Sequence, residues 1–180
     1  MATHIALLRA VNVGGRNRVG MSDLRAMLEA LDFEDVRTLL QSGNVVFRGG
    51  RGASTAIERK LEHESRERLG LAVDYVVRTA DEWQRAIDEN PFAKAARSDP
   101  AHLLVLFMKD ELEPSRVKEL EAAIRGPEIV RARGKHLYAV YPEGVGQSKL
   151  TIALIEKKLA TRGTGRNWNT VLKLAALSRE

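Results

Sequence analysis

Apolar residues in this chain fall into short runs and into longer stretches with helical spacing, and the two kinds alternate. The first run, "HIALLRAV" at positions 4–11, is typical of a buried strand. From Leu24 to Leu31, apolar residues recur at intervals that predict an amphipathic helix, with Ser22 as its N-cap. The chain is therefore predicted to begin with a strand followed by a helix.

The alternation continues through the next fifty residues. The runs "VRTLL" (36–40) and "NVVFR" (44–48) predict two neighbouring strands on either side of a short polar corner. A capping box of Thr55 and Glu58 predicts the second helix, and "VDYVVR" (73–78) predicts a further strand. The resulting order, β-α-β-β-α-β, is the split βαβ or ferredoxin-like arrangement.

The same order returns in the second half of the chain. Three strand-like runs and two helical stretches follow one another: 102–108, a helix from Pro114, 128–133, 136–141 and a helix from about Leu150. No closing strand is evident after them, and a terminal helix is expected at 171–180. The second copy of the pattern is therefore predicted to be incomplete.

These patterns predict an α+β protein built from two tandem ferredoxin-like units. The first unit is expected at 1–78, a helix and linker at 79–100, and the second unit with its C-terminal helix at 101–180. Thr79 and Glu82 form a further capping box at the start of the linking helix. Units of about 80 to 100 residues are near the lower size for a stable core, so the two are expected to pack together. Within a unit we expect the first and third strands to run parallel, which places the loop after the first strand and the corner before the third near opposite ends.

Composition adds limits on the kind of protein. The 180 residues are 44% apolar, as in ordinary globular proteins, and include no cysteine, which excludes disulfides, thiolate metal sites and cysteine nucleophiles. The N-terminal stretch lacks the pattern of a signal peptide, and no apolar run approaches the roughly 18 residues that span a bilayer. We therefore expect a cytoplasmic protein that does not bind membranes.

Two polar corners near the N-terminus can bind an anion. The loop "NVGGRN" (12–17) lies between a strand and a helix, and its glycines let backbone amides approach a ligand while Arg9 and Arg16 add positive charge. It matches neither the P-loop nor the dinucleotide-binding fingerprint, and a turn that requires glycine is the first interpretation, with the anion-binding loop second. The corner "QSGN" (41–44) offers further donors and acceptors, which are also ordinary turn residues.

The stretch "EGVGQSKL" is a third candidate. Ser148 is suited to cap the following helix, and Lys149 lies near the start of that helix, where a cation opposes the helix dipole. A bound anion would explain this conflict, and so would a solvated lysine.

The stretch "GRNWN" (165–169) precedes the terminal helix, which Asn167 or Asn169 would cap. Trp168 is suited to stack on a base or a sugar, with Arg166 on a phosphate. Alternatively, the tryptophan anchors the last helix to the core. Both interpretations stay open at the level of sequence.

Other kinds of chemistry have less support. The four histidines are dispersed without metal-ligand spacing, so no metal and no cofactor are expected. Acidic pairs such as Asp81–Glu82 occur at helix starts, where the helix dipole explains them. Aromatic residues make up only 5% of the chain, which argues against the base-stacking platform of an RNA-recognition domain. The net charge of +5 still permits contacts to a nucleic-acid backbone.

The unusual stretches taken together resemble one bacterial family. The segments "ALLRAVNVGGRNRVGMSDLRAMLEAL", "VRTLLQSGNVVF", "GQSKLT" and "RNWNTVLKL" resemble the family called domain of unknown function 1697 over essentially the full chain, with Ala10 as a departure where the family more often has glycine. The resemblance implies a pair of ferredoxin-like units and no particular activity. It also implies a common surface formed by the motif residues Arg9, Asn12, Gly14, Gly15, Gln41, Ser42, Asn44, Ser148, Lys149, Arg166, Asn167, Trp168 and Asn169.

We take these residues, together with Arg16, as candidate ligand-binding residues. The first hypothesis is a domain that binds a small phosphorylated or carboxylated ligand. The alternatives are a nonspecific nucleic-acid binder and a structural or protein-interaction module. The sequence leaves the ligand, the question of enzymatic activity and the oligomeric state open.

Overall fold

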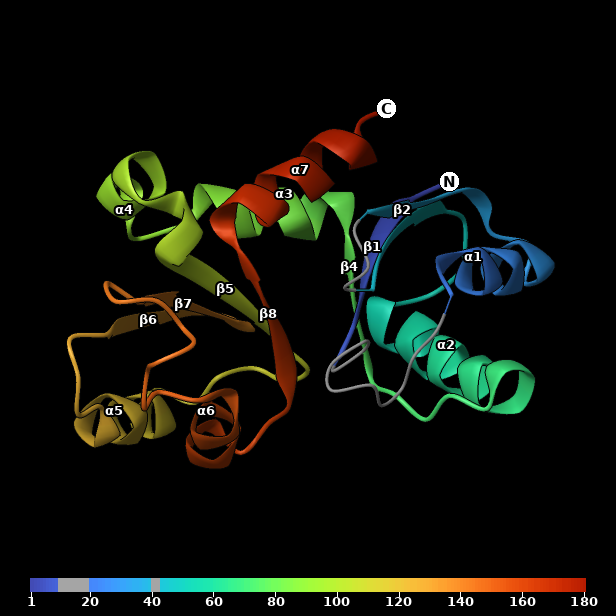
Figure 1. Ribbon diagram of the computed structural model, residues 1–180. Coiled ribbons are helices and arrows are strands. Elements are labelled where there is room, and N and C mark those ends of the chain that lie inside the picture. The colour runs from blue at the N-terminus through green and yellow to red at the C-terminus, as the bar shows by residue number, and fades with distance from the viewer. Residues whose placement is uncertain (10–19, 40–42) are drawn as a thin grey trace. The chain divides into compact units, whose positions relative to one another are not determined.

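The computed structural model of the protein describes residues 1–9, 20–39 and 43–180 (Figure 1). The chain divides into two compact units. Unit 1 comprises Met1–Gln84 and Leu174–Glu180, and unit 2 comprises Arg85–Lys173. Both boundaries fall inside helices, namely α3 (Ala80–Asp88) and α7 (Trp168–Ser178).

Unit 1 contains a four-stranded antiparallel sheet. Its elements are β1 (Thr3–Leu8), α1 (Met21–Ala30), β2 (Glu34–Leu39), β3 (Asn44–Arg48), α2 (Ser54–Leu69) and β4 (Tyr75–Thr79). The strand order is β2-β3-β1-β4. Helices α1 and α2 lie on the same side of the sheet, where Ala6, Phe47 and Leu61 belong to the buried core (Figure 1).

The two central strands of unit 1, β1 and β3, run antiparallel, with Leu7 paired to Asn44. The expectation that the first and third strands are parallel is therefore wrong. Because the strands are antiparallel, the end of β1 lies beside the start of β3, and the Leu8 amide donates to the Gly43 carbonyl at 2.9 Å. The described residues that border the two predicted anion-binding corners thus meet at one end of the sheet, not at opposite ends.

Unit 2 repeats this arrangement. After α4 (Ala93–Ser98), which lies in the segment expected to hold a helix and linker, and the short 3₁₀ helix Pro100–His102, its elements are β5 (Leu103–Met108), α5 (Pro114–Ala123), β6 (Ile129–Arg133), β7 (His136–Val140), α6 (Ile152–Leu159) and β8 (Gly163–Asn167). The strand order is β6-β7-β5-β8, and every pair is antiparallel. The predicted incompleteness of the second copy is wrong, because β8 closes it. Both units are thus mixed α+β with four strands each.

Strand β8 has an unusual sequence, "GTGRN", because it packs closely on its neighbour. A Cβ on Gly163 would overlap Met108 and the Phe107 carbonyl, and one on Gly165 would press on Leu104 at 3.3 Å. Glycine is therefore required by contact with β5, even though glycine ordinarily weakens a strand.

The two sheets also share their register. Ile5 pairs with Arg78 in unit 1, and Val105 pairs with Arg166 at the equivalent position of unit 2. The residue after each arginine caps the helix that follows. Thr79 forms the predicted capping box with Glu82, with hydrogen bonds of 2.7 and 3.1 Å, and this prediction is confirmed. Asn167 accepts from the Thr170 amide at 3.0 Å and caps α7, and Trp168 is buried.

Two predicted caps in unit 1 are wrong. Ser22 lies inside α1, whose N-cap residue is Gly20. Helix α2 follows Ala53, which makes no side-chain cap. Glu58 was expected to bond back to the helix start, but its carboxylate accepts from the Val77 amide of β4 at 2.9 Å instead. Within the described parts of the chain, no helix is long and apolar enough to span a membrane.

Candidate functional site

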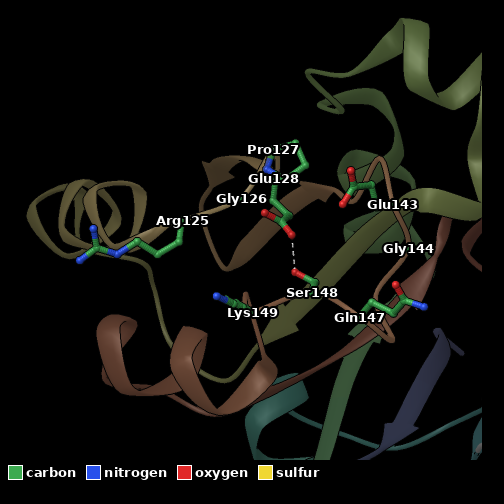
Figure 2. A pocket seen from close by; sticks show the side chains of 9 residues that line it. All are labelled: Arg125, Gly126, Pro127, Glu128, Glu143, Gly144, Gln147, Ser148 and Lys149. Atoms are coloured by element: carbon green, nitrogen blue, oxygen red, sulfur yellow. Dashed lines mark hydrogen bonds between the residues drawn. The ribbon is translucent and has the colours of Figure 1, made fainter.

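Two loops of unit 2 enclose a polar cavity of about 180 Å³ (Figure 2). One loop joins α5 to β6 and the other joins β7 to α6. The lining residues are mostly charged or polar: Arg125, Gly126, Pro127, Glu128, Glu143, Gly144, Gln147, Ser148 and Lys149. Ser148 and Lys149 are candidates that the sequence identified, and the cavity brings them together.

A short hydrogen bond joins the two loops. The Ser148 hydroxyl donates to Glu128 Oε1 at 2.5 Å and accepts from the Leu150 amide at 3.0 Å (Figure 2). The Glu128 carboxylate folds back over Gly126, where a Cβ would overlap it. A side chain at position 126 would therefore require the end of the flexible Glu128 side chain to move.

The sequence predicted Ser148 as the cap of the following helix, and this prediction is wrong. Thr151 caps α6 instead, because its side chain accepts from the Leu154 amide at 3.2 Å. Ser148 is thus available to hold the Glu128 carboxylate at the cavity.

Tyr141 anchors the base of the second loop. Its hydroxyl donates to the Leu150 carbonyl at 2.9 Å, and the ring is buried. Burial raises the pKa of Tyr141 to about 12, and the negative charge of Glu128 adds to this effect. The hydroxyl therefore stays protonated at neutral pH and acts as a fixed donor.

Charged side chains lie at both ends of the cavity in Figure 2. Arg125 and Lys149 lie on one side of the Glu128–Ser148 bond, with the Arg125 guanidinium extending away from that bond, and Glu143 and Gln147 lie on the other side. Among the residues that the structure describes, none of these four outer side chains forms an ion pair or hydrogen bond with another side chain. The cavity thus offers two cations, an amide and two carboxylates to a ligand, with both cations on one side.

The candidates near the N-terminus lie elsewhere, in unit 1. Arg9 Nη1 lies 3.7 Å from the Asp74 carboxylate, and the Arg9 amide donates to the Asp74 carbonyl. Asn44 is fully buried, and its side-chain amide donates to the Leu39 carbonyl at 2.9 Å, which ties β2 to β3. The remaining candidates of these corners, Asn12, Gly14, Gly15, Arg16, Gln41 and Ser42, lie outside the described residues.

The four candidates at the β8–α7 junction do not line the cavity. Arg166 Nη1 donates to the Thr164 hydroxyl at 2.7 Å and to the Gly165 carbonyl at 2.8 Å. Burial lowers the pKa of Arg166 to about 10, so the guanidinium remains charged at neutral pH. Asn167 is occupied as a helix cap, Trp168 is buried, and Asn169 is exposed.

Sequence reasoning missed the α5–β6 side of the cavity. Arg125 and Glu128 stand in "RGPE", whose Gly-Pro pair is typical of a turn between a helix and a strand. Nothing in that segment indicates a ligand until the fold places it beside Ser148. The useful signal was the repeated element order, since the loops after the first helix and before the second helix meet in such a unit.

The comparisons with known proteins agree with the family resemblance. The model of the family "Protein of unknown function (DUF1697)" matches residues 1–138, so the chain belongs to this family. The fold is similar to the structure of the conserved bacterial protein SP0830 from Streptococcus pneumoniae, with a TM-score of 0.76, 21% sequence identity and 98% of each chain covered. No curated protein matches the chain.

Proposed function

We propose that this member of the DUF1697 family binds a small ligand carrying a carboxylate or phosphate group in the cavity of unit 2. The observation that carries the proposal is the position of Lys149 and Arg125 at one end of that cavity. Neither cation forms an ion pair with a described residue. Arginine and lysine are the side chains that recognise carboxylate and phosphate groups.

The wall also contains two carboxylates, Glu128 and Glu143, which keep their negative charge, and one of them lies away from the cations. Glu128 is held by the Ser148 hydroxyl, and Glu143 lies on the far side of that bond in Figure 2. A ligand can therefore place its anionic group beside Lys149 and donate hydrogen bonds to Glu143 or Gln147. A volume of about 180 Å³ suits a small metabolite and not a polymer.

We also infer that each unit is a ferredoxin-like split βαβ domain. The element order β-α-β-β-α-β and the strand orders β2-β3-β1-β4 and β6-β7-β5-β8 support this. Two expectations from the sequence stay predictions. They are the cytoplasmic location and the division of the chain at 1–78, 79–100 and 101–180.

A thermal-shift series at low salt tests the ligand proposal. The probes are inorganic phosphate, sugar phosphates, nucleotides, dicarboxylates, single-stranded RNA and duplex DNA. A ligand at 100 times its dissociation constant adds about 2.7 kcal/mol, which moves the midpoint by several degrees. We expect one small-molecule class to give this shift, and we expect Lys149→Ala and Arg125→Ala to reduce it.

Lys157→Ala is the matched control, because Lys157 is an exposed cation of α6 that does not line the cavity. An equal shift in wild type, Lys149→Ala and Arg125→Ala would contradict the proposal. Shifts given only by the polymers and lost with salt would indicate the nucleic-acid alternative. The absence of any shift would favour the interaction module.

A further inference from the structure

The corresponding loops of unit 1 form a second concave pocket, with a volume of about 490 Å³. One loop joins α1 to β2 and the other joins β3 to α2. The pocket is lined by Leu31, Asp32, Phe33, Gly50, Arg51, Ala56, Ile57 and Lys60. We propose that it binds a small amphipathic anion, in which a flat apolar group carries a phosphate or a carboxylate.

The location of this pocket follows from the repeat. The two sheets share strand order and register, so the α1–β2 loop corresponds to the α5–β6 loop, and the β3–α2 loop corresponds to the β7–α6 loop. Both pockets therefore lie between the same two loops of their unit. The second site is independent of the first, because it consists only of residues of unit 1.

Part of the wall of the unit 1 pocket is apolar. Phe33 and Ile57 are buried in the core beneath it, and Leu31 is half-buried at its side. Gly50 adopts a φ of +86°, and a Cβ there would lie 3.0 Å from both Phe33 and Ile57. The Gly50 backbone thus packs directly on Phe33 and Ile57, and a side chain at this position would have no room.

Two cations border the apolar wall. Lys60 Nζ lies 5.3 Å from the centroid of the Phe33 ring, where the ring's negative face holds an ammonium group. Arg51 is an exposed residue of the glycine-containing loop "GGRG". Asp32 is the one carboxylate in the lining, so positive charge exceeds negative charge. An apolar wall beside an excess of positive charge is complementary to an amphipathic anion and opposes a cation.

Nuclear magnetic resonance titration distinguishes the two pockets by their glycines. Phenyl phosphate, inorganic phosphate and benzamidine are titrated separately into labelled full-length protein. We expect phenyl phosphate to shift the amide signals of Gly50 and Gly52 and to bind there more tightly than inorganic phosphate. Binding in the unit 2 cavity would shift Gly126 and Gly144 instead, so failure of one site is distinguishable from failure of the other.

Three variants test the chemistry of the unit 1 pocket. Arg51→Ala and Lys60→Ala should each weaken phenyl phosphate binding by about tenfold, the usual effect of losing a charged hydrogen bond. Ala56→Glu should abolish it, because Ala56 is an exposed lining residue and a carboxylate there repels the anion. Arg59→Ala is the matched control, since Arg59 is exposed on α2 outside the lining.

Thermal midpoints near the wild-type value establish that the variants fold. Benzoate replaces phenyl phosphate in a parallel titration and separates carboxylate from phosphate ligands. Three results would overturn the proposal: no shift at Gly50 and Gly52, binding of inorganic phosphate or benzamidine as tight as that of phenyl phosphate, or equal losses in Arg59→Ala and Lys60→Ala.

Discussion

In unit 1, Phe33 of the α1–β2 loop and Ile57 of α2 lie at the pocket, whereas the corresponding loops of unit 2 place Glu128 and Ser148 at theirs. The sheets beneath them are equivalent in strand order and in register. The difference therefore resides in the loops and in the first turns of α2, which do not carry the sheet hydrogen bonds. One scaffold is thus able to present a polar cavity and an amphipathic pocket in the same chain.

The edge strands of the two units, β4 and β8, are each hydrogen-bonded to carboxylates of a helix of the same unit. In unit 1, Glu58 and Glu62 of α2 accept from the amides of Val77 and Tyr75 in β4, at 2.9 and 3.0 Å. In unit 2, Glu156 of α6 accepts from the Gly163 amide in β8 at 3.0 Å. In both units, a helix carboxylate thus satisfies backbone donors that an edge strand would leave open.

The largest effect is expected where β4 and β8 begin. Tyr75 is fully buried and its hydroxyl is hydrogen-bonded to Ser65, so Tyr75→Ala should lower the free energy of unfolding by about 3 to 5 kcal/mol. At the equivalent position, Gly163→Ala should also destabilise, by about 1 to 3 kcal/mol, because its Cβ meets Met108 and the Phe107 carbonyl. Urea unfolding measures the loss of free energy of unfolding in each variant.

Hydrogen exchange then assigns each loss to a unit. Tyr75→Ala should reduce protection mainly in β4, and Gly163→Ala mainly in β8. If either variant reduced protection equally in both sheets, the two units would not respond separately, and the comparison between them would fail.

The second effect concerns Glu58 and Glu156, the helix carboxylates that accept from the edge strands. Glu58 and Arg78 are nearly inaccessible and 3.9 Å apart, so Glu58→Ala leaves a buried cation and the Val77 amide without this partner and should cost about 3 kcal/mol. Glu156→Ala removes the hydrogen bond from the Gly163 amide and should cost about 1 kcal/mol. Chemical denaturation of both variants measures the two losses of free energy of unfolding, and equal losses would contradict the larger contribution expected of the buried Glu58–Arg78 pair.

The repeated element order was accessible from the sequence, because each amphipathic stretch and each apolar run has its own periodicity. Strand β8 was missed because "GTGRN" has neither apolar alternation nor strand-forming residues. Its glycines are required by contact with Met108 and Leu104, which are about sixty residues away in the chain. Capping patterns were confirmed at Thr79 and wrong at Ser22, since a short polar pattern also occurs by chance inside a helix.

Part of the candidate site could be predicted from the sequence. Ser148 and Lys149 stood out because a lysine at a helix start conflicts with the dipole. Arg125 and Glu128 lie about twenty residues earlier, and only the fold brings them to Ser148. The unit 1 pocket was missed altogether, although "GGRG" between a strand and a helix is the same kind of signal as the loop at 12–17.

A third prediction uses the pH dependence of unit 1. His4 is buried against Phe47, and burial lowers its pKa below the usual 6.5, although Glu82 acts in the opposite direction. The His4 imidazole therefore binds a proton more readily in the unfolded chain than in the folded chain. The free energy of unfolding should therefore be highest above about pH 6.5 and should decrease as the pH falls below that value. The loss should be smaller than that caused by Glu58→Ala.

The equivalent residue of β5 is Leu104, which has no titratable group. His4→Leu should therefore remove part of the acid sensitivity, as judged by urea unfolding at pH 7.5 and pH 5. His63→Gln is the control, because His63 is exposed on α2. An unchanged pH dependence in His4→Leu would show that His4 does not contribute.

The smallest effect concerns the helices that follow the two pockets' loops. Helix α6 of unit 2 is capped by Thr151, whereas α2 of unit 1 follows Ala53, an extended residue without a capping side chain. Ala53→Ser should raise the free energy of unfolding by about 1 kcal/mol, and Thr151→Ala should lower it by a similar amount. Thermal and urea unfolding of both single variants measure these changes.

The double variant gives the sharper test. The two caps serve different helices and share no hydrogen-bond partner, so their effects should add and nearly cancel. Serine adds no charge at Ala53, so any change in phenyl phosphate binding would come from the loop geometry alone. Failure of Ala53→Ser alone to raise the free energy of unfolding would mean that the unit 1 loop prevents a hydroxyl at position 53 from reaching the amides of the first turn of α2. The absence of a cap would then be a requirement of that loop, and the difference between the two helices would have the same origin as the difference between the two pockets.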